Sequence, residues 1–160
     1  MSALYFKTKG EQVSQFWYRV PECNLGAGWL AARHYSHNRE EKDWRKPILP
    51  PGEKLLLLTE WSDAVIGFVR QRFRRDNRRG IYCSIFRNES EILSSDLIKD
   101  AVPIVQNKWG DQPVFTFVDP TAVRSQNPGS CFRHAGWKRD GQTAKGLIVF
   151  IWENQQLNKI

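Results

Sequence analysis

Apolar and polar positions alternate with a period of two in several short segments, which is the pattern of half-buried β-strands. A first strand is expected over 16–20. Three more segments follow at close spacing and predict an antiparallel meander, and two later segments are almost continuously apolar, as in strands buried on both faces. The meander strands are expected over 54–60, 64–70 and 81–86, and the later strands over 114–118 and 145–152.

Helical spacing of apolar residues occurs in three places between these strands. One helix is expected over 24–36 with Asn24 as its N-cap. A second helix is expected to be capped by Ser94-Ser95-Asp96, and Pro103 predicts a kink or a break within it. A short third helix follows Asn127-Pro128-Gly129 and ends at a glycine. The segment of about 38–53 is charged and rich in proline, which predicts a long loop. This order of elements predicts an α+β fold, a mixed sheet with an antiparallel meander and flanking helices.

The length and composition of the chain limit its organisation. It has 160 residues, 41% of them hydrophobic, which is enough for one domain with a full core and too few for two of ordinary size. We therefore expect a single domain over 1–160. No run of about 18 apolar residues and no basic-then-apolar N-terminal segment occurs, so we expect a soluble intracellular protein without a membrane partner.

The three cysteines (Cys23, Cys83 and Cys131) are widely spaced and form no CxxC pair. This spacing suggests neither a disulfide framework nor a structural zinc site, and it indicates reduced packing residues. A nucleophilic Cys131 is the less favoured alternative, with His134 three residues away on the same helical face.

Positive charge is concentrated in one predicted hairpin. The chain carries 24 Lys and Arg against 17 Asp and Glu, a net charge of +7. Guanidinium groups form forked contacts with phosphates and attract polyanions, so we expect this hairpin to bind nucleic acid. A solvated turn whose charge serves solubility is the alternative. The arginines concerned are Arg70, Arg72, Arg74, Arg75, Arg78 and Arg79.

Polar residues in distant parts of the chain are candidates for a reaction site. Asp119 follows the apolar segment 114–118, at the strand end where α/β enzymes place polar groups, and His34 and Tyr35 lie at the end of the first predicted helix. Asp119 could bind a metal, transfer a proton or cap the following loop. His34 could take part in the reaction, or it could stabilise the helix by interacting with the negative end of the helix dipole. Ser125 and Asn127 either cap the short helix or bind the anionic part of a cofactor.

The order of elements resembles the GNAT superfamily of N-acetyltransferases, and the resemblance covers most of the chain. In that superfamily a loop of the form Gln/Arg-x-x-Gly-x-Gly/Ala follows the meander and holds the pyrophosphate of acyl-CoA at a helix N-terminus, and the next two strands splay apart. This chain has Arg87-Asn88-Glu89-Ser90-Glu91-Ile92-Leu93-Ser94-Ser95 at that place, with no glycine and two glutamates. Acetyl-CoA is therefore the less expected cofactor, although Arg87, Asn88 and the helix N-terminus could hold another anion.

Within that fold, three features look like the Mom family of phage proteins that modify adenine in DNA. They are His34-Tyr35-Ser36, Arg87-Asn88 before a serine-rich helix start, and Phe117-Val118-Asp119 before a helix and a tryptophan strand. The Asn-Pro-Gly-x-Cys-Phe-x-x-Ala-Gly-Trp run also looks like small acetyltransferase-like phage proteins. The Mom resemblance implies that His34, Tyr35 and Asp119 surround the reacting atom, and that Tyr35 and Asp119 bind a cation such as iron.

The leading interpretation is therefore an enzyme that attaches a small group to a DNA base, in the cytoplasm of a bacterial host, and so protects phage DNA from restriction. DNA is its expected partner, a homodimer is compatible with the sequence, and nothing identifies the donor of the group. Two alternatives stay open. One is a GNAT acyltransferase acting on an amine, and the other is a phage inhibitor without catalysis whose basic face binds a host protein or DNA.

Overall fold

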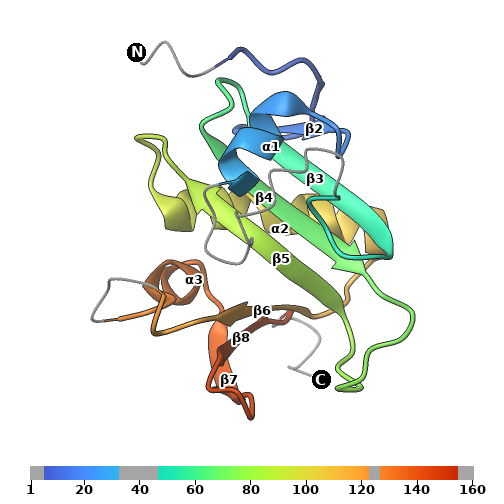
Figure 1. The fold of residues 1–160 in the computed structure, drawn as a ribbon, viewed down its shortest axis with the longest axis vertical. Coiled ribbons are helices and arrows are strands. Elements are labelled where there is room, and N and C mark those ends of the chain that lie inside the picture. Colours follow the sequence, from blue (N-terminus) through green and yellow to red (C-terminus); the bar gives the residue numbers. More distant parts are fainter. Residues whose placement is uncertain (1–5, 33–46, 123–126, 155–160) are drawn as a thin grey trace.

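The structure is a computed structural model that describes residues 6–32, 47–122 and 127–154. The described residues form one eight-stranded mixed sheet with three helices (Figure 1). The helices are α1 (Leu25–Ala32), α2 (Ser94–Trp109) and α3 (Ser130–His134). The strands lie in the order β1-β2-β3-β4-β5-β6-β8-β7, and they are β1 (Glu11–Gln12), β2 (Trp17–Val20), β3 (Glu53–Thr59), β4 (Ala64–Arg70), β5 (Ile81–Asn88), β6 (Val114–Val118), β7 (Lys138–Gln142) and β8 (Ile148–Trp152).

All neighbouring strands of this sheet are antiparallel except β5 and β6, which run parallel and are connected through α2. A parallel pair needs such a crossover because the chain must return to the same end of the sheet. The α+β prediction is confirmed, together with the antiparallel meander β3–β4–β5 and its flanking helices. No helix in the described part of the chain is long and apolar enough to cross a membrane.

Both faces of the meander are buried, which explains the unbroken leucine run of β3. Leu55 and Leu57 pack into the cluster that includes α2, and Leu56 and Leu58 pack into the cluster that includes α1. In Figure 1, α1 lies in front of the sheet and α2 lies behind it. Because alternate residues of a strand point to opposite faces, a strand covered on both sides needs no polar positions.

The helix ends agree with the sequence prediction in one case and differ in another. The side-chain oxygen of Asn24 accepts the N–H of Ala27 at 3.0 Å, so the predicted N-cap of α1 is confirmed. The predicted serine cap of α2 is wrong, because Leu93 occupies the N-cap position and provides no side-chain hydrogen bond. The helix also continues through Pro103 to Trp109, so the break considered there does not occur.

Two strands were missed by the sequence pattern. β1 and β7 lie at the two edges of the sheet, and every residue of both is exposed. An edge strand whose two faces are both exposed to solvent shows no alternation of apolar and polar residues. It is held in place by main-chain hydrogen bonds to the neighbouring strand. The predicted strand over 145–152 is found as β8. Of the predicted loop of about 38–53, the part up to residue 46 lies outside the described residues, and Glu53 already belongs to β3.

Candidate functional site

The parallel strands β5 and β6 are paired at one end only, and they diverge from there toward α3 (Figure 1). Ile81 pairs with Val114 and Tyr82 pairs with Phe115, and the rest of the two strands is unpaired with each other. We call the diverging part, 83–88 of β5 and 116–118 of β6, the splay. It leaves two strand edges facing one another without a ladder between them, which is a place where an extended ligand could bind.

A β-bulge in β5 coincides with this divergence. Phe68 of β4 pairs with Cys83 and Gly67 pairs with Ile85, so Ser84 has no residue opposite it. A bulge bends its strand and increases the local twist. The Ser84 bulge is therefore the physical reason that β5 turns away from β6 beyond this point.

The Ser84 hydroxyl is buried and has no hydrogen-bond partner among the described residues. The neighbouring carbonyl oxygen of Cys83 is satisfied, because it accepts the hydroxyl of Thr116 at 2.8 Å. Leaving a buried hydroxyl unpaired costs about 1–3 kcal/mol, and folded proteins pair nearly all such groups. The unpaired hydroxyl therefore marks the bulge as a position whose hydrogen bonding the described residues do not complete.

The short helix α3 is held near the splay by aromatic contacts. The ring of Phe132 lies 6.1 Å from that of Phe86 in β5 and 4.9 Å from that of Trp137. The N–H groups of Gly136 and Trp137 donate to the carbonyl oxygens of Arg133 and Phe132, at 2.9 and 3.0 Å. These two bonds form a Schellman motif, which confirms the predicted helix end at a glycine.

The thiols near the splay are not activated. Burial raises the pKa of the Cys83 thiol to about 12 and also raises the pKa of the Cys131 thiol. Both stay protonated at neutral pH, and the thiolate is the nucleophilic form, so the Cys131–His134 alternative loses its chemical basis. Cys23 is exposed, which contradicts its assignment as a packing residue.

The turn between β5 and α2 is shaped by the side chain of Asn88. Its amide nitrogen donates to the carbonyl oxygen of Ile92 at 2.7 Å and to the hydroxyl of Ser94 at 3.0 Å, and its oxygen accepts the N–H of Ser90 at 2.9 Å. Asn88 was predicted to bind a cofactor. In the structure its side chain bonds three residues of the turn and so fixes the path of the chain between β5 and α2.

Charged side chains of opposite sign are paired in this turn. Arg87, the second predicted cofactor contact, donates to the carboxylate of Glu89 at 2.7 Å, and Glu91 is exposed. Leu93 provides no side-chain hydrogen bond to the first turn of α2, although its carbonyl oxygen accepts the N–H groups of Asp96 and Leu97 at 3.0 and 3.2 Å. Uncapped N–H groups at a helix N-terminus carry partial positive charge and favour an anion.

Asp119 is held in a tight turn at the end of β6. Its carboxylate accepts the hydroxyl of Thr121 at 2.7 Å and the N–H of Thr121 at 2.9 Å. These hydrogen bonds lower the pKa of Asp119, so the group is ionised at neutral pH. The loop-capping role considered from the sequence is therefore present. His34, Tyr35 and Ser125 lie outside the described residues.

The expected metal site stays a prediction, because Tyr35 is not described. Among residues 6–32, 47–122 and 127–154, no group of three or more His, Cys, Asp or Glu side chains could hold a metal ion. Asn127, predicted to bind a cofactor, is exposed, and its carbonyl oxygen accepts the N–H of Ser130 at 3.1 Å in the turn that starts α3.

No protein-family model and no curated protein matches the sequence. Solved structures do match. The aminoglycoside acetyltransferase AAC(6')-Ib in complex with coenzyme A is similar over 90% of this chain and 97% of that chain, with a TM-score of 0.64 and 14% identity. AAC(6')-Ib with ribostamycin and coenzyme A gives a TM-score of 0.64 at 15% identity, over 90% and 96% of the chains. The aminoglycoside N-acetyltransferase AAC(6')-Ib11 gives 0.60 at 16% identity, over 91% and 99%.

The chain has the GNAT fold. The fold resemblance drawn from the order of elements is thereby confirmed, and at this level of identity it is the fold alone that is shared. The closeness to Mom proteins stays a prediction. Within the GNAT fold of this chain, the splay, the Asn88 turn and the N-terminus of α2 are neighbours along β5 and its crossover.

The arginine run forms the hairpin between β4 and β5, at the opposite end of β5 from the Asn88 turn. The six steps from residue 81 to residue 87 span roughly 20 Å at about 3.3 Å per step, so the structure does not bring this hairpin to the open end of the splay. Arg78 pairs with Asp140 of β7 at 2.9 Å. Four of the six predicted phosphate contacts are exposed, namely Arg70, Arg72, Arg75 and Arg79.

Arg74 is engaged inside the hairpin. Its guanidinium lies 4.9 Å from the ring centre of Phe115 and 5.0 Å from that of Tyr82. It donates to both carboxylate oxygens of Asp76, at 2.9 and 2.7 Å, and to the side-chain oxygen of Gln71 at 2.6 Å. The hydrogen bond from Arg74 lowers the pKa of Asp76 to about 2. Arg74 therefore anchors the hairpin, and its donors are not directed to a phosphate.

Sequence reasoning missed two residues of interest. Ser84 is a polar position inside the apolar run Ile81–Phe86, which is a weak signal for a bulge, but the missing partner in β4 is a matter of register between strands. Phe73 is a lone aromatic residue among the arginines, and it is 93% exposed. A large apolar side chain placed between charged ones is the signal that could have identified it.

Proposed function

We propose that this chain is an N-acyltransferase that moves an acyl group from an acyl-CoA to an amine. The observation that carries the proposal is the splay, where β5 leaves β6 at the Ser84 bulge. An extended thioester arm can lie between the two strands and bond to their free edges, as peptides do at open sheet edges. The AAC(6')-Ib structures that share this fold hold coenzyme A, which supports the choice of donor.

In this reaction the amine nitrogen attacks the thioester carbonyl carbon, the carbon–sulfur bond breaks, the thiol leaves, and the amine loses a proton. The Ser84 hydroxyl can donate to the carbonyl oxygen as negative charge develops on it. Asp119 is ionised at the end of β6 and is the candidate to accept the amine proton. The N-terminus of α2 can face the phosphates of the donor.

The phosphate end of the donor meets a turn that differs from a glycine-rich loop. Asn88 gives the turn its shape, and Arg87 balances the charge of Glu89. The negative charge of Glu91 repels the phosphates of the donor, and the N–H groups in the first turn of α2, which has no side-chain cap, attract them. On the strength of the fold and the splay we revise the expectation, drawn from the missing glycines, that acetyl-CoA is the less favoured cofactor.

Modification of a DNA base is compatible with this reaction when the acceptor is an exocyclic base amine. The exposed arginines of the hairpin favour an acceptor carried by a polyanion. A DNA partner, a homodimer and a cytoplasmic location stay predictions.

Ser84→Ala tests the proposal through two readouts that should move in opposite directions. Removing a buried hydroxyl without a partner should raise the free energy of unfolding by about 1 kcal/mol. The same change should lower kcat/KM for acetyl-CoA about tenfold, since one hydrogen bond to the reacting group is lost. Urea denaturation measures the first effect, and release of the CoA thiol in the presence of a polyamine measures the second.

Ser14→Ala is the matched control. The Ser14 hydroxyl donates to Asp100 at 2.6 Å, so its loss should lower stability and leave kcat/KM unchanged. Full activity in a well-folded Ser84→Ala variant would remove Ser84 from the site. Absence of acetyl transfer by the parent to any amine tested would contradict the proposed function itself.

A further inference from the structure

The hairpin between β4 and β5 presents an aromatic ring to solvent. Phe73 is 93% exposed, more than any other large apolar side chain in the described part of the chain. It lies between two hollows of about 650 and 610 Å³ and contributes to the lining of both. Both sides of the ring therefore border open space.

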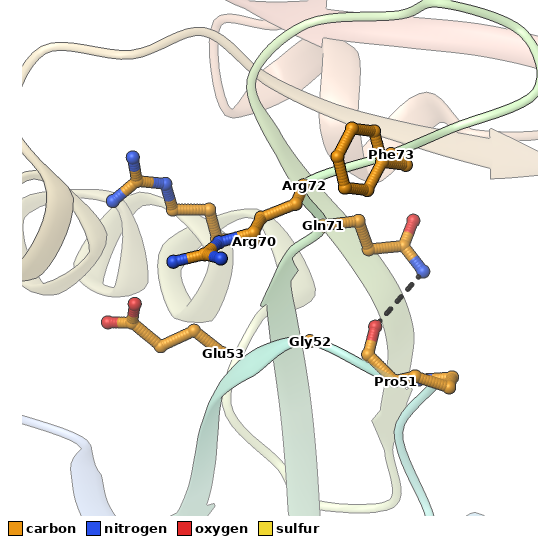
Figure 2. Close-up of a pocket in the computed structure, with 7 residues that line it drawn as sticks. All are labelled: Pro51, Gly52, Glu53, Arg70, Gln71, Arg72 and Phe73. Atoms are coloured by element: carbon orange, nitrogen blue, oxygen red, sulfur yellow. Dashed lines mark hydrogen bonds between the residues drawn. The ribbon is translucent and has the colours of Figure 1, made fainter.

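Exposed arginines line the same two hollows as this ring, Arg70 and Arg72 the first and Arg75 the second. Figure 2 shows the side chains of Arg70 and Arg72 extending to the same side, while Phe73 lies on the other. Arg75 lines the second hollow together with Lys145. No ion pair links Arg72, Arg75 or Arg79 to another described residue.

The carboxylates of these hollows are already engaged. Glu53 accepts the indole N–H of Trp109 at 2.9 Å and lies 3.5 Å from Lys108, and the Trp109 hydrogen bond, with the Lys108 charge, lowers its pKa. Asp76 is bound by Arg74 at 2.7 Å. The charge of Arg70 also contributes to the lowered pKa of Glu53, so Arg72, Arg75 and Arg79 are the hairpin cations that these acids leave unpaired.

The hairpin has a defined shape, because Arg74 pins it to the sheet. Its guanidinium is stacked on the rings of Phe115 and Tyr82, and its side chain is 15% exposed. A hydrogen bond from the Gln71 amide to the carbonyl oxygen of Pro51, at 3.3 Å, ties the base of the hairpin to the neighbouring segment (Figure 2). Burying Arg74 holds its neighbours Phe73 and Arg75 at the surface.

We propose that this hairpin is a binding surface for single-stranded nucleic acid, in which Phe73 stacks on an unpaired base and the exposed arginines contact the phosphates on either side. Aromatic rings beside a positively charged track are the arrangement that binds single strands without sequence preference. A duplex fits less well, because its bases are stacked on each other and cannot receive the ring. The surface is selective for unpaired strands for that reason.

In the proposed acyl transfer, the nucleic acid bound at this surface carries the acceptor amine. The biological role of the surface rests on the proposed function, whereas the binding itself does not depend on acyl transfer. Binding is measured without acyl-CoA, so its failure is distinguishable from failure of the transferase. The hairpin lies roughly 20 Å from the open end of the splay, a distance that a strand of a few nucleotides can span.

Fluorescence anisotropy with labelled oligo-dT and oligo-U, and with a duplex of equal length, tests the proposal over a range of salt concentrations. Phe73→Ala should weaken single-strand binding about 5- to 150-fold and leave the salt slope unchanged, since one stacked base is lost. Phe73→Trp should retain the affinity, and Phe73→Leu should not. The triple variant Arg72→Ala, Arg75→Ala, Arg79→Ala should reduce the slope of log affinity against log salt by about 2.

Lys9→Ala, Arg19→Ala, Lys99→Ala is the charge-matched control, made of exposed cations outside the hairpin. It should leave the salt slope within about 0.5 of the parent. An equal slope change in both triple variants would overturn the proposal, as would unchanged single-strand binding by Phe73→Ala. A parent that prefers the duplex, or that binds no polynucleotide, would also overturn it, and the second result would point to a protein partner.

Discussion

Gly129→Ala should lower the free energy of unfolding by about 2–5 kcal/mol. Gly129 has a φ of 79° at the start of α3, a conformation that a residue with a Cβ adopts at a cost. An added Cβ would also lie 2.2 Å from an atom of the Phe150 ring, which is buried in the core. The ring cannot retreat without disturbing β8, so both costs apply. Urea denaturation measures the loss.

Gly136→Ala is the matched control for this prediction. Gly136 has a φ of 93°, but a Cβ there would meet no atom within 4 Å. Its substitution should cost about 1–2 kcal/mol, from the backbone conformation alone. Equal losses in the two variants would show that α3 shifts freely away from Phe150, and would contradict its role as a fixed element beside the splay.

Arg74→Ala should lower the free energy of unfolding by about 2–3 kcal/mol at neutral pH. The variant loses the stacking on Phe115 and Tyr82 and the charge-assisted hydrogen bonds to Asp76. Arg75→Ala removes the same charge from the next residue, which is exposed, and should change stability by about 0.5 kcal/mol or less. Equal effects of the two substitutions would show that the hairpin needs no anchor.

The stability difference between the parent and Arg74→Ala should also depend on pH. The folded pKa of Asp76 is about 2, below its ordinary value of 3.8, so the pair stabilises the parent above about pH 4. This contribution is lost as the pH falls from about 4 to 2 and Asp76 becomes protonated. The difference between the two proteins should therefore narrow over that range, and a constant difference would assign the effect to ring stacking alone.

The sequence predicts those parts of the fold in which buried residues recur at a regular spacing along the chain. Leu55 to Leu58 in β3 and most residues of β4 are apolar because both faces of the sheet are covered there. The bounds of the meander strands were therefore predicted within a few residues. The edge strand β7 was missed because its sequence, KRDGQ, has no buried position. Whether α2 continues through Pro103 was left open, because local propensity argues against it. Seven apolar residues of that helix are buried in the core cluster, and their burial outweighs the local cost.

The candidate site was harder to predict, because it depends on contacts between distant segments. Asp119 was predicted as a site residue from its place at a strand end, and the structure adds the Thr121 turn that engages its carboxylate. The unpaired position of Ser84 follows from the register of β4 against β5, which no local pattern reveals. Likewise, the sequence does not distinguish the six arginines of the hairpin from one another. The structure shows that Arg74 packs on the rings of Phe115 and Tyr82 and so anchors the hairpin.

Binding of acyl-CoA in the splay is the central claim, and hydrogen exchange with and without acetyl-CoA tests it most directly. Backbone amides gain protection where a ligand orders and covers them. We predict protection concentrated in 83–96, which covers the bulge, the Asn88 turn and the first turn of α2, and in 116–120, with little change in the hairpin 71–79. Protection absent from 83–96 and 116–120 at millimolar acetyl-CoA, or confined to the hairpin, would contradict the account.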